Sequence, residues 1–252
     1  MPPPDPWLPF RRPRPGARLR LFCFPYASGG ASLYRAWPAG LPADVEVCAV
    51  QLPGREGRIA EPPIPAMTTL VPLVADALAP YLDLPFALFG HSMGSIVSFE
   101  LCRELRRRKA PMPFQLIASG CHSPDLPDRD VIHDKSDEEI FKHLGALGGI
   151  SKAALENREL MAMVLPLIRA DGSITETYRF TEEEPLDVPL AAFGGELDPK
   201  ATRETIEAWR PHSKGPVSTE YFPGDHFFLN SDRDRVIASV ARIIRGSFSA
   251  RG

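Results

Sequence analysis

Six short apolar runs recur along the chain, and each of them ends at or near a proline or a glycine. The runs cover residues 19–24, 45–50, 86–89, 114–118, 190–193 and 217–222. Most are continuously apolar, which is typical of strands that are buried on both faces of a parallel sheet. Patterns with helical spacing lie between them, and strands that alternate with helices indicate βαβ units. The sequence therefore predicts an α/β fold with a mostly parallel central sheet flanked by helices.

Apolar residues repeat at helical spacing in three of the intervening segments, over residues 70–81, 96–105 and 236–244. We expect Thr68 or Thr69 to cap the first of these helices. The third is expected to begin after Ser231 as its cap and to stop at Gly246.

The stretch of about 125–185 interrupts the alternation, because it contains helical patterns and no convincing strand. Ser136 and Glu139 form a capping box at the start of one predicted helix. A second helix is expected from Ser151 to about Ile168. We interpret the stretch as a helical lid inserted into a single domain of residues 17–252. Residues 1–16 contain seven prolines and three arginines, and we expect them to form an extended or disordered tail.

Composition excludes several classes of protein. A chain of 252 residues with 44% hydrophobic residues can bury a sizeable core, and its net charge of −3 gives no overall attraction to nucleic acid. It has no run of 18 apolar residues, so we expect no membrane span. Its four cysteines form no C-x-x-C pair and are expected to be buried thiols. We expect a cytoplasmic monomer that binds neither nucleic acid nor membrane.

A candidate nucleophile lies in the pentapeptide Gly90-His91-Ser92-Met93-Gly94, which has the pattern G-x-S-x-G. The pattern follows a buried-type strand and opens an amphipathic helix, which is the context that a nucleophile elbow requires. Ser92 would then stand at the end of the strand, close to the helix N-terminus. The alternative is a glycine-rich turn in which the serine only caps the helix.

Serine needs a base, and the order in hydrolases of this kind is serine, acid, histidine. His226 follows the last predicted strand and is the expected base, with His212 as the less favoured alternative. Asp198 follows the preceding strand and is expected to orient His226 and to stabilise its imidazolium form. Glu196 and Asp225 are weaker candidates for the acid.

An oxyanion hole completes the prediction. One donor is expected to be the backbone N–H of Met93, directly after the nucleophile. The other should come from the loop after the first strand, where Ala27 is the preferred residue and Tyr26 the second choice.

Several short motifs in the chain, taken together, resemble those of the stand-alone type II thioesterases of polyketide and nonribosomal peptide synthases. They are Phe24-Pro25-Tyr26-Ala27, Gln51-Leu52-Pro53-Gly54-Arg55-Glu56, Gly90-His91-Ser92-Met93-Gly94, Leu165-Pro166-Leu167-Ile168-Arg169-Ala170-Asp171, Gly194-Gly195-Glu196-Leu197-Asp198-Pro199 and Pro223-Gly224-Asp225-His226-Phe227-Phe228. They span nearly the whole chain in the family's order. One departure is the loop after the first strand, which usually reads A-G-G-S and here reads Ala27-Ser28-Gly29-Gly30.

The resemblance implies an α/β-hydrolase fold with a helical lid and a serine thioesterase with the triad Ser92, His226 and Asp198. The substrate would be an acyl group on the phosphopantetheine arm of an acyl or peptidyl carrier protein, and no metal or other cofactor is implied. The enzyme would remove aberrant or stalled chains. A carboxylesterase of small free esters and an acyl-binding protein on an inactive hydrolase fold are the alternatives.

Substrate-binding residues are predicted at Tyr26, Met161, Met163 and Leu165. The three lid residues would line an acyl chamber, because flexible thioethers accommodate varied chains; ordinary lid packing is the alternative. Two basic features are interpreted mainly as solvated surface. Arg55 and Arg58 would otherwise meet the phosphate of the arm, and the run between Arg103 and Lys109 would otherwise meet an acidic carrier protein or nucleic acid.

Overall fold

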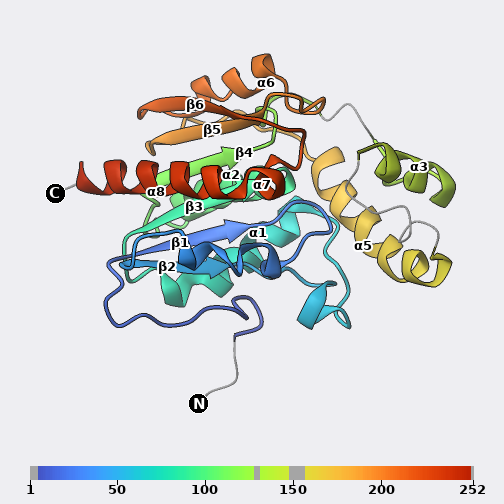
Figure 1. Cartoon of the computed structure of the whole chain (residues 1–252), viewed down its shortest axis with the longest axis horizontal. Helices are drawn as coiled ribbons and strands as arrows, with labels where there is room; N and C mark the ends of the chain where they lie inside the picture. Colours follow the sequence, from blue (N-terminus) through green and yellow to red (C-terminus); the bar gives the residue numbers. More distant parts are fainter. Residues whose placement is uncertain (1–4, 128–130, 148–156, 251–252) are drawn as a thin grey trace.

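All six predicted strands are present and pair in parallel as one sheet, in the order β2-β1-β3-β4-β5-β6 (Figure 1). This computed structural model describes residues 5–127, 131–147 and 157–250. The strands are β1 (Leu19–Phe24), β2 (Val45–Ala49), β3 (Phe86–His91), β4 (Gln115–Ser119), β5 (Leu190–Gly195) and β6 (Val217–Phe222). The predicted α/β architecture is confirmed.

Alternate side chains of each strand enter two different cores. In β1, Phe22 and Phe24 point to the face covered by α1 (Met67–Leu78) and α2 (Met93–Arg107). Leu21 and Cys23 point to the face covered by α8 (Arg233–Ser249). Burial on both faces explains why β1 reads as a continuous apolar run rather than as an alternating one.

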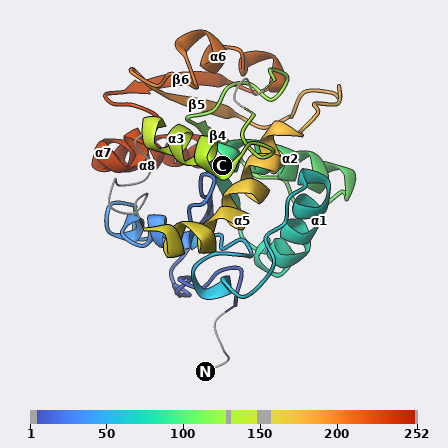
Figure 2. The ribbon, with the colours of Figure 1, turned by 90° about the vertical axis from the view of Figure 1, so that its right-hand side faces the viewer.

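Helices cover both faces and the carboxyl end of the sheet (Figures 1 and 2). They are α1 (Met67–Leu78), α2 (Met93–Arg107), α3 (Asp137–Leu147), α5 (Arg158–Glu176), α6 (Arg203–Glu207), α7 (Phe228–Ser231) and α8 (Arg233–Ser249). No described helix is long and apolar enough to cross a membrane.

Three of the boundaries predicted for α1 and α8 are wrong. Helix α1 begins at Met67, before either threonine, because Met67 is itself buried with Leu70 in the core, and no side chain caps it. Helix α8 continues through Gly246 to Ser249, because Phe248 packs on Phe114 and holds the last turn in place. Its N-cap is Asp232, whereas Ser231 ends α7.

The stretch between β4 and β5 contains α3 and α5, which lie beyond the carboxyl ends of the strands (Figures 1 and 2). The capping box is present: Ser136 N–H donates to Glu139 Oε2 at 3.0 Å, and Glu139 N–H to Ser136 Oγ at 3.4 Å. Helix α5 continues to Glu176, eight residues beyond the predicted end at Ile168, because its C-terminal half is buried against the domain. The predicted start at Ser151 lies outside the described residues.

The prediction of a disordered tail is wrong for residues 5–16. Leu8 is 1% exposed, and Trp7 O accepts a hydrogen bond from Gln51 N–H at 2.8 Å. The Arg58 guanidinium lies 4.2 Å from the centre of the Trp7 ring. Proline and arginine content suggested disorder, but the two apolar side chains between the prolines dock on the core and order the segment.

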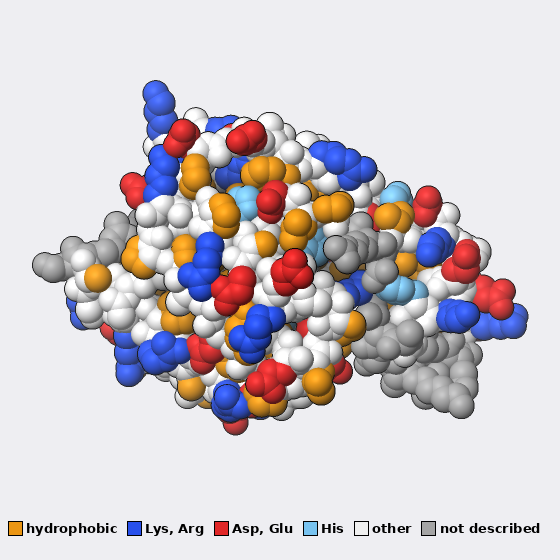
Figure 3. All heavy atoms as spheres, turned by 90° about the horizontal axis from the view of Figure 1, so that it is seen from above, with side chains coloured by type: hydrophobic (Ala, Val, Ile, Leu, Met, Phe, Trp, Pro, Cys, Tyr) orange, Lys and Arg blue, Asp and Glu red, His pale blue; other side chains and the backbone are white. Residues whose placement is uncertain are grey.

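The distribution of surface charges and the state of the cysteines are as the sequence predicts. Acidic and basic side chains are interspersed over the face seen in Figure 3, as the small net charge leads one to expect. All four cysteines lie among the described residues, and each is a buried thiol outside any disulfide.

Candidate active site

Ser92 lies at a sharp turn between β3 and α2, where its backbone has φ +54° and ψ −121°. A non-glycine residue in this region is strained, and such strain is typical of functional turns. The flanking glycines make the turn sterically feasible: a Cβ on Gly90 would lie 2.0 Å from Gly94 O, and one on Gly94 would lie 2.3 Å from Phe24 O. The predicted elbow geometry is therefore present, and it presents Ser92 Oγ at the carboxyl end of β3.

Ser92, His226 and Asp198 form a continuous chain of hydrogen bonds. His226 Nε2 lies 2.9 Å from Ser92 Oγ, and His226 Nδ1 lies 2.8 Å from Asp198 Oδ2. His226 and Asp198 are 6% and 5% exposed, whereas Ser92 is partly exposed, so the hydroxyl remains accessible. The sequence placed these residues on three separate strand ends, and the parallel sheet brings the ends together.

The environment of Asp198 favours its carboxylate form. Burial alone would raise the pKa of this group, but the hydrogen bond and charge of His226, together with the backbone N–H groups of Lys200 and Ala201, outweigh it, and the pKa lies below its usual value. The other oxygen, Oδ1, accepts the N–H groups of Lys200 and Ala201 at 2.8 and 3.2 Å. An ionised Asp198 requires a proton on His226 Nδ1, which leaves Nε2 free to accept the serine proton.

The less favoured candidates lie in other environments. His212 Nε2 bonds Asp125 Oδ1 at 2.9 Å, and its ring packs against Phe99, Phe180 and Trp209. Glu196 is exposed. Asp225 caps its own turn by accepting the N–H of Phe227 at 2.8 Å.

His91 is a site residue to which sequence reasoning gave no role of its own. It is fully buried, and its Nε2 lies 2.9 Å from the carbonyl oxygen of His226 while Nδ1 lies 2.9 Å from Ser119 Oγ. A carbonyl only accepts, so Nε2 carries the proton and Nδ1 accepts from the serine hydroxyl. Burial, followed by the nearby His226, lowers the pKa of His91 to about 3. The ring is therefore neutral at physiological pH and holds the main chain of His226 in place.

The loop after β1 lies beside Ser92 and offers backbone donors. Ser28 N–H donates to Asp171 and Gly29 N–H donates to Tyr26 O, so neither is available. Within the described part of the chain, the N–H groups of Tyr26, Ala27 and Met93 have no hydrogen-bond acceptor. The predicted donors Met93 and Ala27 thus retain the free N–H that an oxyanion hole needs, and Tyr26 retains its own as well.

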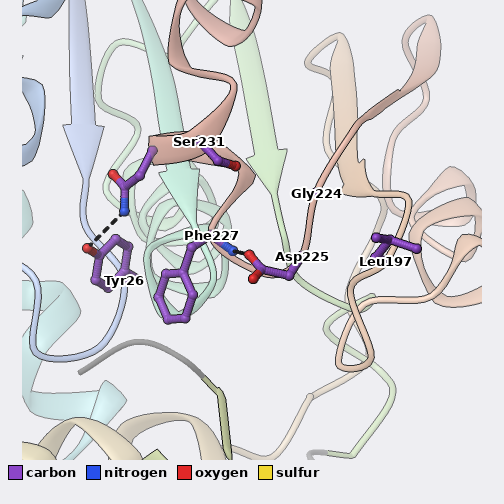
Figure 4. Close-up of a pocket in the computed structure, with 7 residues that line it drawn as sticks. Tyr26, Leu197, Gly224, Asp225, Phe227 and Ser231 are labelled. Carbon is purple, nitrogen blue, oxygen red and sulfur yellow. Dashed lines mark hydrogen bonds between the residues drawn. The ribbon is translucent and has the colours of Figure 1, made fainter. Parts of the chain in front are cut away.

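An open pocket of about 630 Å³ adjoins the triad (Figure 4). The rings of Tyr26 and Phe227 lie on one side of it, 5.4 Å apart between their centres and nearly perpendicular. Leu197, which precedes Asp198, is 75% exposed at the other side. The pocket therefore combines apolar side chains from the residues that flank both Asp198 and His226.

The three predicted lid residues do not line this pocket. Met161 is 1% exposed and packs with Ile140 and Ile168 in a small cluster inside the lid, and Leu165 packs against the same cluster. Met163 is 66% exposed. The acyl-chamber prediction is corrected: Met161 and Leu165 use their apolar surface to hold α3 to α5, which is ordinary lid packing.

The prediction that Arg55 and Arg58 are solvated turn residues is wrong. Arg55 is 3% exposed and binds both carboxylate oxygens of Asp171 in α5, at 2.7 and 2.8 Å. Arg58 is 9% exposed, and it binds Glu61 and donates to Gln51 O. The sequence indicated Asp171 only as the last residue of the motif Leu165–Asp171. Its pairing with Arg55 could not be predicted, because no spacing rule links the two residues.

The basic run at the end of α2 is engaged within the molecule. Arg103, Arg106 and Arg107 all pair with Glu183, which lies on the segment after the lid. Arg108 pairs with Glu104 and Asp76. The basic run therefore holds the segment that leads from the lid to β5 against the end of α2.

Comparisons with known proteins show the family to which the chain belongs. The family described as "Thioesterase domain" matches residues 19–247. The gramicidin S biosynthesis protein GrsT of Aneurinibacillus migulanus is 40% identical over 230 residues, which cover 91% of this chain and 90% of that protein.

Solved structures give the same result. RedJ, a thioesterase from the prodiginine biosynthetic pathway in Streptomyces coelicolor, is 42% identical, with a TM-score of 0.84 over 90% of this chain and 85% of that one. YbtT, a type II thioesterase from the yersiniabactin NRPS/PKS pathway, is 34% identical, with a TM-score of 0.83 over 95% and 98%. The chain thus belongs to the thioesterase family of α/β-hydrolase fold, among relatives that are type II thioesterases of nonribosomal peptide and polyketide biosynthesis.

Proposed function

We propose that this protein hydrolyses acyl groups from the phosphopantetheine arm of acyl or peptidyl carrier proteins, and so clears aberrant or stalled chains from a nonribosomal peptide or polyketide synthase. The observation that carries the proposal is the hydrogen-bonded chain Ser92–His226–Asp198 in a member of the thioesterase family. The names of GrsT, RedJ and YbtT support the pathway class.

In the first step, Ser92 Oγ attacks the thioester carbonyl while His226 Nε2 takes its proton. The contact of 2.9 Å between the two atoms suits this transfer. Asp198, held as a carboxylate, stabilises the imidazolium that forms. The carbon–sulfur bond then breaks, and the pantetheine thiol leaves with the proton from His226. A thiol has a pKa near 8.5, so its departure needs less help from an acid than that of an alcohol.

In the second step, water attacks the acyl–Ser92 ester. His226 accepts a proton from the water and returns it to Ser92 Oγ, which releases the free acid and restores the enzyme. The N–H groups of Met93 and Ala27 stabilise the oxyanion in both steps. Each such donor is typically worth about 10²–10³ in rate.

Substrate would reach Ser92 beside the open pocket that Tyr26 and Phe227 border. Tyr26 is the residue we propose to contact it, since its ring lies 5.9 Å from His91 and 5.4 Å from Phe227 between centres. The chemistry needs no metal or cofactor besides the arm that the carrier brings. We place the reaction in the cytoplasm, with the carrier protein as partner.

The test compares an acyl group of one length on a carrier protein with the same acyl group as a free ester. We expect a higher kcat/KM for the carrier thioester across a panel of graded chain lengths. Turnover of the free esters alone would identify a carboxylesterase instead. Failure of a fluorophosphonate probe to label Ser92 would favour a binding protein on an inactive fold.

A further inference from the structure

Asp171 reaches from the lid helix into the loop that carries Ala27. Its carboxylate is fully buried, and Oδ2 accepts the N–H of Ser28 at 2.6 Å and a guanidinium nitrogen of Arg55 at 2.7 Å. Its Oδ1 accepts the other terminal nitrogen of Arg55 at 2.8 Å. Arg55 in turn donates to Gly29 O at 3.2 Å. One ion pair thus engages the loop at two successive residues.

The loop needs such a hold because its backbone is strained. Ser28 has φ +63°, the left-handed region that favours glycine, and it stands where the resembled family usually has glycine. A non-glycine residue stays in this region when surrounding contacts determine it. The hydrogen bond that Ser28 N–H donates to Asp171 fixes the peptide group that joins Ala27 to Ser28. The preceding peptide group, which carries the Ala27 N–H, is held by the bond from Gly29 N–H to Tyr26 O at 2.9 Å.

The segment after β2 holds the rest of the loop. Gln51 Oε1 accepts the N–H of Ala31 at 2.9 Å, and Gln51 Nε2 donates to Arg55 O at 3.1 Å. Ser32 N–H donates to Glu56 at 3.3 Å. Two of the motifs, Gln51–Glu56 and Leu165–Asp171, therefore both hold this loop, and none of the hydrogen bonds described joins either of them to the triad.

We propose that Asp171 is a positioning residue for the oxyanion hole, which acts through Ser28 and Arg55 and couples the lid helix to the loop that bears Ala27. A buried ion pair is in itself weak evidence for a stabilising role, since apolar pairs of similar volume often serve as well. The Asp171–Arg55 pair has a different role, because Asp171 accepts the N–H of the strained residue Ser28 in the loop beside Ser92. The inference rests on the proposed function, in which Ala27 N–H receives the oxyanion.

The test uses Asp171→Asn, with Glu100→Gln as the matched control. Glu100 is 8% exposed and pairs at 2.6 Å with Arg103, which is 3% exposed, so both substitutions remove the carboxylate of a buried pair. Substrates are an acyl-carrier thioester and a p-nitrophenyl ester of the same acyl group. An alkyl boronic acid, whose tetrahedral adduct with serine places an oxygen in the oxyanion hole, serves as the inhibitor.

We expect Asp171→Asn to lower kcat by about 10²-fold, with a similar loss of boronate affinity, because a misplaced oxyanion donor costs this much. KM should stay within about threefold for both variants, and Glu100→Gln should change kcat and boronate affinity no more than that. A kcat and boronate affinity that fall no further for Asp171→Asn than for Glu100→Gln overturn the proposal.

Two controls keep the result decisive. If Asp171→Asn does not fold, the double variant Arg55→Met/Asp171→Leu removes both charges at once and should fold; we expect the same loss of kcat, and parental kcat overturns the proposal. If the parent cleaves only the p-nitrophenyl ester, the proposed carrier substrate is wrong, while the comparison of variants on that ester still decides the role of Asp171.

Discussion

His91 holds the main chain of His226, with 2.9 Å between its Nε2 and the carbonyl oxygen of the residue whose ring contacts Ser92. The two histidines lie 135 positions apart in sequence, one as the last residue of β3 and the other on the loop after β6. His91 is itself held in place, because it is fully buried and its Nδ1 bonds Ser119 Oγ. It can therefore position His226.

This arrangement makes stability depend on pH. The pKa of His91 is lowered to about 3 in the folded protein, so between pH 6.5 and 3 the unfolded chain binds a proton that the folded chain does not. Acidification through this range therefore lowers the free energy of unfolding, by up to about 1.4 kcal/mol per pH unit. His91→Gln removes this contribution, so the stability difference between parent and variant should shrink as pH falls from 7 to 4.5.

Urea denaturation at several pH values measures that difference. Asp198 does not interfere, because its lowered pKa means that the stability it contributes is lost only below about pH 4. A difference between parent and His91→Gln that stays constant from pH 7 to 4.5 would contradict the prediction.

Asp198→Asn should lower kcat by about 10⁴-fold, the size of effect seen when the acid of such a triad becomes an amide and the histidine adopts the wrong tautomer. Glu196→Gln is the control, because Glu196 lies two residues away on the same turn and is exposed. Its kcat should stay within about threefold of the parent. Comparable losses in both variants, measured under saturating substrate, would argue against Asp198 as the acid.

The strain at Ser92 predicts a difference between two inactive variants. A non-glycine residue at φ +54° costs about 1–3 kcal/mol, whereas glycine in the unfolded chain loses up to about 1 kcal/mol more in entropy. Ser92→Gly should therefore be more stable than Ser92→Ala, by about 1 kcal/mol in chemical denaturation. A less stable glycine variant would mean that the turn is relaxed.

Met161 and Met163 form a natural matched pair on α5, since one is 1% and the other 66% exposed. Met161→Ala should weaken the lid by about 2–5 kcal/mol, the cost of truncating a buried methionine. Met163→Ala should change stability by less than about 0.5 kcal/mol. Native-state hydrogen exchange of α3 and α5 measures both, and equal protection in the two variants would be inconsistent with the packing described here.

Sequence reasoning reached the sheet and the positions of Ser92, His226 and Asp198 because each depends on local signals. A buried strand reads as a run of apolar residues, and residues placed directly after parallel strands must meet at one edge. The short range of these signals also sets their limit. The start of α1 and the length of α8 depend on whether Met67 and Phe248 find partners in the tertiary structure, and no local pattern reveals that.

Buried polar contacts were the least predictable part. Arg55 looked like a surface residue because arginine is seldom buried without a partner, and its partner Asp171 lies 116 residues away. Met161 and Met163 are two positions apart in one helix, and only the placement of α3 decides which of them is covered. The N-terminal segment looked disordered from composition, yet Trp7 and Leu8 pack against the core and help to dock it.

The most direct test of the central claim is single-turnover hydrolysis of an acyl-carrier thioester by the parent and by Ser92→Ala. We predict that the parent releases the free acid and passes through an acyl group covalently bound at Ser92, which mass spectrometry of the quenched reaction detects. Ser92→Ala should form no such adduct and should lose at least about 10⁴-fold in rate. Hydrolysis by Ser92→Ala at the parental rate would contradict the account.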